Sequence, residues 1–363
     1  MLLPVAGVLI VFMYEKIGRQ DGGTNQVLAT IKSKDDVPFL SAPLIFVSTL
    51  LTHLTGGSAG REGASIQFGG SIGNWLGKLA HLDEFDHHVM IMCGMSAAFA
   101  AVFGTPMAAA VFAMEVVSVG VMYYAALLPC VIASIIAAEF ATGMGIDPET
   151  FPVHSIPGLT VETGLKMALI AVGCGILSIL FCILLKTVGQ LYTKYLKNPY
   201  IRIVVAAGVI ILLTICLNTK DYMGAGSGLI ARAIEKGEAR PLDFLWKMLL
   251  TALTMRAGYR GGEIVPAFSI GATFGCVAGG ILGFSPELAA AASMVALFCG
   301  VTNCPITAML ISFELFGFSG AAYYLIAISI SYAVSGYYSL YKDQTIVYLS
   351  LIHISEPTRL GMI

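Results

Sequence analysis

An Arg-Glu pair, Arg61 and Glu62, lies in a glycine-rich segment early in the chain. The segment, GGSAGREGASIQFGG, leads directly into an apolar stretch. A glycine-rich loop before a helix directs backbone N–H groups and the positive end of the helix dipole at one place, which suits a dehydrated anion. A carboxylate at Glu62 would occupy the position of that anion when ionised and leave it when protonated. Glu62 is therefore a candidate gate and proton carrier.

A structural role for Glu62 is the alternative. The side chain could pair with the neighbouring Arg61, or it could cap the helix that follows. Ionisable side chains at membrane depth are costly, however, and those that occur there usually serve function. The surrounding glycines add to this argument, so we favour the functional interpretation.

The composition indicates an integral membrane protein. Hydrophobic residues make up 57% and charged residues 12% of the 363 residues, whereas a soluble domain has about 25% charged residues. Several apolar runs are shorter than the roughly 20 residues that a helix needs to cross a bilayer. Short apolar segments interrupted by glycine are typical of broken or re-entrant helices in transporters and channels. We therefore expect an all-α membrane protein that transports a solute.

Several other classes of function are not supported. The net charge of -2 gives no electrostatic basis for binding nucleic acid. The eight cysteines fall singly in apolar segments, without C-x-x-C spacing, which indicates packing rather than a metal site. We expect no metal and no cofactor. An intramembrane protease would be an alternative class, but the chain has no HExxH or GxGD-like motif, so we do not expect an enzyme.

Two sequence motifs occur twice. The segment at residues 96–117 matches 293–316, so that Pro106 and Glu115 correspond to Pro305 and Glu314. The segment at 60–73 aligns with 262–275, which places Glu62 opposite Ile264. The two copies are about 200 residues apart, and repeated halves of a membrane protein commonly form inverted repeats with the binding site between them. For Glu115 and Glu314, we expect hydrogen bonds to helix ends rather than ion transport.

The repeat defines the domain organisation that we expect. A single transport domain covers residues 1–349, with a first repeat at about 1–140, a linker rich in Gly and Pro at about 141–163 and a second repeat at about 164–341. The segment 350–363, SLIHISEPTRLGMI, does not continue the preceding pattern and is expected to be a non-native tail. We expect the natural protein to extend beyond both ends of this sequence.

These motifs resemble those of the CLC family of chloride channels and halide/proton antiporters. GREGA at 60–64 is similar to the GREGP motif of that family, and GEIVP at 262–266 is similar to its GxFxP motif. The GTP sequence at 104–106 and SLY at 339–341 match two further motifs in order and spacing. The resemblance implies two inverted-topology repeats with broken and re-entrant helices. It also implies a multi-pass protein of the prokaryotic plasma membrane, in contact with lipids and assembled as a homodimer.

The resemblance also implies the roles of individual residues. Glu62 would be the external gating glutamate, and the hydroxyl of Tyr341 would contact the bound anion. Glu263 would be a second carboxylate in gating and proton transfer. The remaining residues expected to bind the anion, mainly through their backbone, are Gly60, Arg61, Gly63, Ile264 and Val265.

The chain departs from the chloride-transporting members at several positions. The expected serine-containing loop is DGGTN at 21–25, without serine, and Val116 occupies the position of the inner proton-transfer glutamate. Glu263 and Ile264 replace a neutral residue and Phe, and Ala64 replaces Pro. This combination resembles the fluoride-exporting branch of the family. We therefore expect fluoride export coupled to proton import; a chloride channel or chloride/proton antiporter is the alternative. For Glu263 the alternative is an ion pair with Arg61, Arg256 or Arg260.

Overall fold

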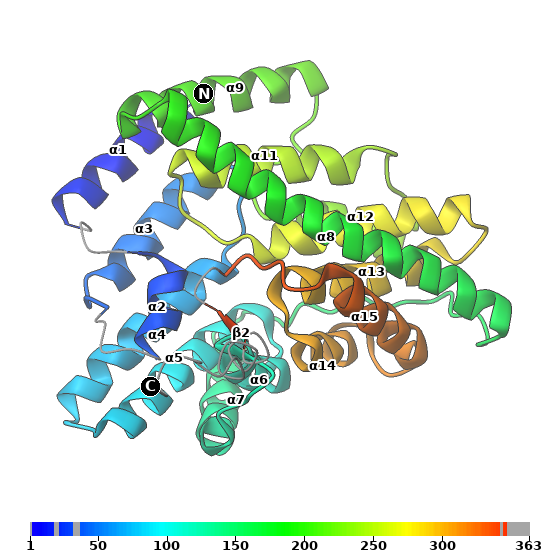
Figure 1. Ribbon diagram of the computed structural model, residues 1–363, viewed down its shortest axis with the longest axis horizontal. Coiled ribbons are helices and arrows are strands. Elements are labelled where there is room, and N and C mark those ends of the chain that lie inside the picture. Colours follow the sequence, from blue (N-terminus) through cyan, green and yellow to red (C-terminus); the bar gives the residue numbers. More distant parts are fainter. Residues whose placement is uncertain (1, 18–21, 32–36, 342–343, 347–363) are drawn as a thin grey trace, which may run out of the picture.

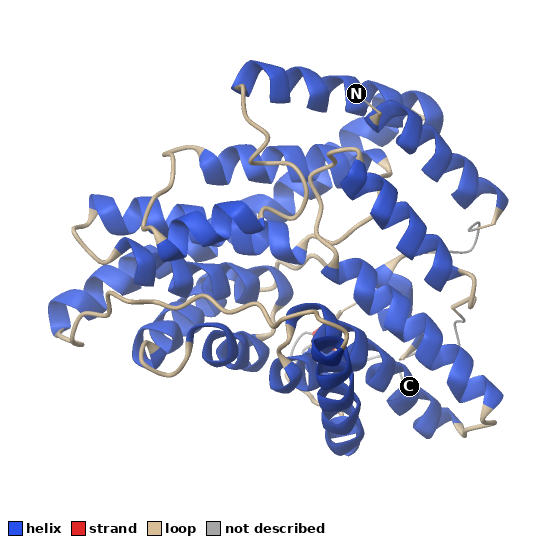
Figure 2. Ribbon diagram, turned by 180° about the vertical axis from the view of Figure 1, so that it is seen from behind, coloured by secondary structure: helices blue, strands red, loops and turns tan. Residues whose placement is uncertain are grey.

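The computed structural model describes residues 2–17, 22–31, 37–341 and 344–346, and nearly all of this chain is helical (Figures 1 and 2). The helices are α1 Leu3–Lys16, α2 Thr24–Thr30, α3 Ser41–Leu54, α4 Glu62–Leu79, α5 Glu84–Phe103, α6 Pro106–Glu115, η1 Tyr124–Ala126, α7 Leu127–Gly143, α8 Val161–Tyr195, α9 Pro199–Leu217, α10 Ser227–Glu235, α11 Asp243–Ala257, α12 Ile264–Ile281, α13 Pro286–Thr302, α14 Pro305–Phe316 and α15 Ala321–Ser335. Two short strands, β1 Ser118–Val119 and β2 Thr345–Ile346, pair in parallel.

The helices have the lengths expected of a multi-pass membrane protein. Within the described residues, five helical segments are long and apolar enough to cross a membrane: α5, η1 with α7, α8, α9 and α12. Five further apolar helices, α3, α6, α13, α14 and α15, have only 10–17 residues. The prediction of an all-α membrane fold with short, broken helices is therefore confirmed.

Corresponding helices follow one another in the same order in the two parts of the chain. Helices α4 and α12 have 18 residues each, and each packs against the helix before it and the helix after it. The same correspondence runs from α1 to α7 and from α9 to α15 (Figure 1). The long α8 has 35 residues and lies along α11, α13 and α15. Residues 144–160, inside the predicted linker, join α7 to α8 without regular structure, and the predicted tail at 350–363 lies outside the described residues.

Local sequence explains the break before α6 and the break before α14. Helix α5 ends at Gly104 and α13 ends at Asn303, both in the left-handed conformation with φ of 70° and 56°. Glycine and asparagine adopt this conformation at the end of a helix more readily than other residues do. Pro106 and Pro305 then begin the next helices, where the missing proline N–H costs nothing. Each half therefore contains a short helix that begins inside the protein.

Two glutamates close the starts of these short helices. Glu115 accepts hydrogen bonds from the Ile306 N–H at 3.0 Å, the Thr307 N–H at 2.8 Å and the Thr307 hydroxyl at 2.6 Å. Glu314 accepts from the N–H groups of Met107 and Ala108, both at 2.9 Å. Each carboxylate thus satisfies the free N–H groups of the short helix in the other half. The prediction that both glutamates bind helix ends is confirmed.

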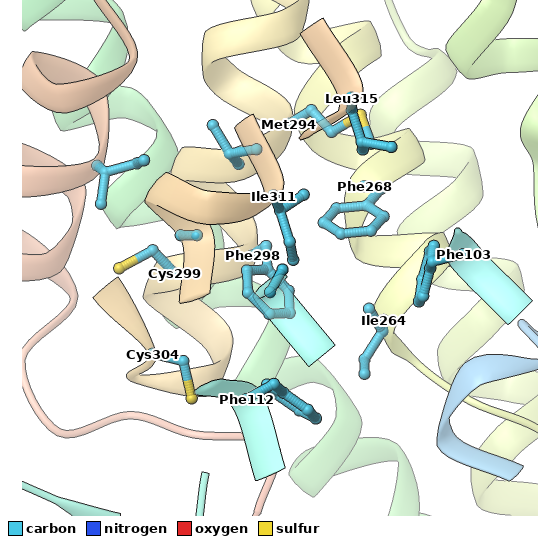
Figure 3. Packing of buried hydrophobic residues seen from close by; sticks show 14 of the residues in the cluster. Phe103, Phe112, Ile264, Phe268, Met294, Phe298, Cys299, Cys304, Ile311 and Leu315 are labelled. Atoms are coloured by element: carbon cyan, nitrogen blue, oxygen red, sulfur yellow. The ribbon is translucent and has the colours of Figure 1, made fainter. Parts of the chain in front are cut away.

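Aromatic residues from both halves pack together behind these helix starts (Figure 3). Phe112 of the first half lies 6.0 Å from Phe298 of the second, measured between ring centroids. Phe103 lies 5.9 Å from Phe268, and Phe268 lies 5.2 Å from Phe298. These contacts bury large apolar areas across the boundary, so neither half has a complete core of its own.

Replacement of Glu115 by Ala should destabilise the protein, because it leaves two buried donors of Thr307 and the partly buried N–H of Ile306 without an acceptor. We expect the free energy of unfolding to fall by about 3 kcal/mol, the scale for buried donors that lose their partner. Unfolding of the purified protein in detergent measures this change. Glu139→Ala, at an exposed position of α7, is the matched control. Equal stability of the two variants would contradict the capping role.

Candidate functional site

The two glycine-rich motifs meet at a pair of backbone hydrogen bonds. The Gly60 N–H donates to the Gly262 carbonyl and the Gly262 N–H donates to the Gly60 carbonyl, both at 2.7 Å. Gly60 and Gly262 correspond in the repeat, so this contact brings the starts of α4 and α12 side by side. A Cβ on Gly63 would lie 2.8 Å from the Gly262 Cα, and a Cβ on Gly262 would collide with the Gly63 nitrogen. Only glycine allows the two backbones to approach this closely.

This contact gathers most of the residues expected to bind an anion. Gly60, Arg61 and Gly63 lie at the start of α4, and Ile264 and Val265 begin α12. Ile264 and Val265 are buried, with 1% and 3% of their surface exposed. The starts of two helices, each with free backbone N–H groups, therefore lie together inside the protein, and this arrangement favours negative charge.

Glu62 is the first residue of α4, and its side chain is buried. The carboxylate interacts with the backbone N–H groups of Arg61 and of Glu62 itself, while Oε2 has no hydrogen-bond partner among the described residues. A Cβ on Gly60 would collide with this Oε2. The carboxylate thus folds back over Gly60 and lies where a small anion could lie.

Of the two structural alternatives for Glu62, an ion pair with Arg61 is not observed among the described residues, whereas the carboxylate does lie against N–H groups at the start of α4. Arg61 points away, with 56% of its side chain exposed, and its Nη2 lies 3.4 Å from Oε1 of Glu149 in the linker. Arg61, rather than Glu62, is the N-cap residue of α4, and no side-chain hydrogen bond caps the helix. Burial raises the pKa of Glu149 in the linker, and the Arg61 guanidinium lowers it. The Arg61 guanidinium thus lies 3.4 Å from Glu149 and also interacts with Glu62 through space.

Tyr341 reaches the same region from the other end of the chain. The segment after α15 turns back so that the Leu340 N–H donates to the Val301 carbonyl at 2.8 Å. The Tyr341 side chain is buried and interacts electrostatically with both Glu62 and Glu263. Three of the residues singled out in the sequence are thus within electrostatic range of one another.

Glu263 is the N-cap residue of α12 and lies beside Arg256. Its Oε1 is 3.7 Å from Nη2 of Arg256, and 23% of its side chain is exposed. Of the three arginines considered as partners, the structure pairs Glu263 with Arg256. At 3.7 Å this is an ion pair without a hydrogen bond, so Glu263 keeps its capacity to bind a proton or another partner.

A cavity of about 1070 Å³ leads toward Arg256. Its cationic residues are Lys186, Arg202 and Arg256, and no carboxylate lines it among the described residues. Ser339 and Leu340, next to Tyr341, form part of its wall. A cavity lined by one sign of charge concentrates ions of the opposite sign. Anions can therefore collect beside Arg256 and Glu263.

Two expected differences from the chloride-transporting pattern can be located. Val116 follows α6 directly and is 1% exposed within an apolar cluster. In the loop at 21–25, Asp21 lies outside the described residues. Thr24 begins α2, and its hydroxyl donates to the Gly63 carbonyl at 3.1 Å. A threonine hydroxyl of this loop is thus held beside the start of α4.

Sequence reasoning missed Lys247, which lies in α11 and is fully buried. Its Nζ donates to the Gly224 carbonyl at 2.7 Å, and to the Tyr222 carbonyl and the Ser58 hydroxyl, both at 3.1 Å. Ser58 belongs to the glycine-rich loop that precedes Glu62. A lone lysine inside the apolar stretch FLWKMLLTAL was the available signal, because such residues at membrane depth are seldom without function.

The sequence is similar to known membrane transport proteins over nearly its whole length. The family model "Voltage gated chloride channel" matches residues 6–336. The "Chloride/fluoride channel protein" of Pseudomonas syringae pv. tomato is 33% identical over 356 residues, which cover 95% of this chain and 78% of that protein. The H(+)/Cl(-) exchange transporter of Vibrio cholerae is 28% identical over 272 residues; these cover 70% of this chain and 58% of the relative.

Two solved structures share the fold. A CLC-type fluoride/proton antiporter superposes with a TM-score of 0.90 and 33% identity, over 95% of this chain and 88% of the other. A slow cyanobacterial Cl-/H+ antiporter superposes with a TM-score of 0.79 and 17% identity, over 98% of this chain and 86% of the other. At that identity the second likeness concerns the fold alone.

Replacement of Gly262 by Ala should destabilise the protein, because the added methyl group collides with the backbone of Gly63. We expect a loss of about 1–3 kcal/mol in unfolding free energy, the usual cost of overpacking. Gly280→Ala, in the helix α12 that follows Gly262, is the matched control, because its Cβ would meet no atom within 4 Å. Unfolding in detergent compares the two. A Gly262→Ala variant as stable as Gly280→Ala would contradict the close approach.

Proposed function

This chain belongs to the voltage-gated chloride channel family, and we propose that it exports fluoride from the cell in exchange for protons. The observation that carries this proposal is the position of Glu62. Its carboxylate is buried at the paired starts of α4 and α12, against backbone N–H groups, with Oε2 free of hydrogen bonds to the described residues. A group in this position competes with an anion when ionised and gives way when protonated. It can thereby link the movements of the two ions.

The exchange follows from the charge on Glu62. Ionised Glu62 holds the place of the anion and closes the pathway. Protonation removes the charge that the backbone N–H groups favour, so the side chain can leave and fluoride can take its place. Return of the carboxylate expels the anion and releases the proton. The backbone of Gly60, Arg61, Gly63, Ile264 and Val265, together with the hydroxyl of Tyr341, supplies the contacts to the anion.

Glu263 supports fluoride as the substrate. Fluoride is small and strongly hydrated, so a site must replace its water with strong, compact donors. A protonated carboxyl group is such a donor, and Glu263 lies beside the basic cavity that concentrates anions. Fluoride and a proton can therefore meet at Glu263, with no ionisable group needed at Val116. The 33% identical structure, that of a fluoride/proton antiporter, supports the same substrates.

The alternative is chloride transport, by a channel or by a chloride/proton antiporter. The 28% identical relative from Vibrio cholerae, named as an exchanger of protons and chloride, supports it. For either substrate, we propose a single transport domain of two repeats in a prokaryotic plasma membrane. We further propose that the domain assembles as a homodimer among membrane lipids, and that it moves ions without acting as an enzyme.

Fluoride efflux measured against chloride efflux tests the substrate. From proteoliposomes loaded with both ions, we expect fluoride to leave at least about tenfold faster, equivalent to about 1.4 kcal/mol of discrimination. We expect Glu263→Ala to abolish fluoride efflux while the protein remains folded, because the proton-bearing partner of fluoride is lost. Glu139→Ala serves as the control. Equal efflux of both ions, or a fully active Glu263→Ala variant, would favour chloride transport.

Glu62→Gln tests the gate. The amide resembles the protonated carboxyl group but cannot exchange a proton, so proton movement driven by a fluoride gradient should vanish. The measurement is the pH change outside weakly buffered proteoliposomes after a fluoride gradient is applied. Gln67, also buried in α4, provides a matched control as Gln67→Glu, which adds a carboxylate away from the helix start. Coupled proton flux at the original rate in Glu62→Gln would remove Glu62 from the mechanism.

A further inference from the structure

Lys247 places a cation inside the protein, close to the gate. No part of its side chain is exposed, and three oxygen atoms lie within 3.1 Å of its Nζ: two carbonyls and the hydroxyl of Ser58. An ammonium group has three N–H donors and no acceptor. Three oxygens around the nitrogen match these donors, and the two carbonyls can only accept. The surroundings of Lys247 therefore fit the charged form.

The ammonium group joins loops from the two halves. Ser58 belongs to the loop that ends at Glu62, whereas Tyr222 and Gly224 belong to the loop between α9 and α10. The same two loops also bond directly: the Ala59 N–H donates to the Gly224 carbonyl at 3.1 Å, and the Gly224 N–H donates to the Gly57 carbonyl at 2.9 Å. Lys247 thus lies beneath the loop that sets the position of Glu62.

The charge of Lys247 has no ion-pair partner in the described part of the chain. The carboxylate that interacts with it through space is Glu62. Asp243, one turn earlier in α11, is already bonded to Arg232 at 3.0 Å and to the Tyr222 hydroxyl at 2.6 Å. Ionised Glu62 is therefore the group that balances the buried ammonium.

The other charged or titratable groups near Glu62 do not neutralise the charge of Lys247. Arg61 lies 3.4 Å from Glu149, and 56% of its side chain is exposed. Glu263 lies beside Arg256. His53 of α3 interacts with both Arg61 and Lys247, and its Nδ1 lies 2.9 Å from the Thr49 carbonyl.

The phenol of Tyr341, the remaining titratable group near Glu62, is neutral at physiological pH. Arg61 also interacts with Glu62 through space, but its side chain is largely exposed, where solvent screens its charge. Lys247 is the fully buried cation of this region among the described residues.

The first half shows that the fold does not require a lysine at this position. In the repeat alignment of 60–73 with 262–275, the residue that corresponds to Lys247 in α11 is Ile45 in α3. Ile45 is also buried, with 2% of its surface exposed. An apolar side chain therefore fills the equivalent place in the other half. Packing alone does not account for a cation at this position.

We infer that Lys247 is the fixed positive charge that links protonation of Glu62 to binding of the anion, an inference that rests on the proposed function. When Glu62 is ionised, the two charges balance. When Glu62 takes up a proton, the buried ammonium is left without a counter-charge, which is unfavourable in an apolar interior. A fluoride ion then restores the balance. The charge of Lys247 therefore stabilises one negative charge in the site, which is either the Glu62 carboxylate or a fluoride ion.

The experiment is fluoride binding to the purified full chain, measured by calorimetry from acidic to neutral pH. We expect Lys247→Met to weaken fluoride binding about tenfold or more at acidic pH, because the attraction by a buried charge is lost. We also expect the pH midpoint of binding to move upward, because ionised Glu62 loses its counter-charge and holds its proton more tightly. Lys247→Arg should keep the wild-type midpoint.

Two further variants separate charge from structure. Lys247→Gln keeps an N–H donor for the loops but has no charge, and should behave as Lys247→Met does. Lys220→Met removes an exposed lysine from the same loop region and should bind fluoride as the wild type does. If Lys247→Gln bound fluoride more weakly without a change in the pH midpoint, the role of Lys247 would be structural only. Fluoride binding by Lys247→Gln equal to that of the wild type would lead to the same conclusion. Absence of proton-linked fluoride binding in the wild type would instead refute the proposed function itself.

Discussion

The structure depends on how backbone N–H groups are satisfied where helices begin inside an apolar protein. The helices α4, α6, α12 and α14 start in the interior, and each presents free N–H groups that favour a negative partner. For α6 and α14 the partners are Glu314 and Glu115 from the opposite half. For α4 and α12 the two helix starts face each other across Gly60 and Gly262. The repeat thus creates two pairs of anion-attracting helix ends, and the glutamates cap one of these pairs permanently.

The sequence predicted the features that depend on local pattern. The apolar runs and the duplicated motifs led to the all-α membrane fold, and the paired Pro and Glu residues led to the caps made by Glu115 and Glu314. Neighbouring positions in the sequence did not predict which charged side chains form ion pairs. Arg61 neighbours Glu62, yet its guanidinium bonds to Glu149 of the linker, because the first residue of a helix and its N-cap direct their side chains differently. The roles of Glu62, Glu263 and Tyr341 stay predictions.

Lys247 could not be predicted because its partners are distant in the sequence. Ser58 is 189 residues away, and the carbonyls of Tyr222 and Gly224 are backbone atoms that no residue pattern reveals. The basic cavity could not be predicted either, because its cationic residues, Lys186, Arg202 and Arg256, come from three different helices. Such features arise from the packing of helices and loops that are distant in the sequence. Sequence reasoning can mark a lysine in an apolar helix as unusual, but only the fold identifies its neighbours.

The number of hydrogen bonds distinguishes the capping glutamates from Glu62, the carboxylate that we propose to move. Glu115 accepts three hydrogen bonds, including one of 2.6 Å from a hydroxyl, so displacing it leaves three donors, two of them buried, without an acceptor. Glu62 has one oxygen without a partner among the described residues and lies over a glycine that leaves room for it. In our proposal, its departure exposes the N–H groups of a helix start, and an incoming anion then accepts their hydrogen bonds. The same electrostatic principle therefore accounts for the caps at two helix starts and for the exchangeable carboxylate that we propose at the site.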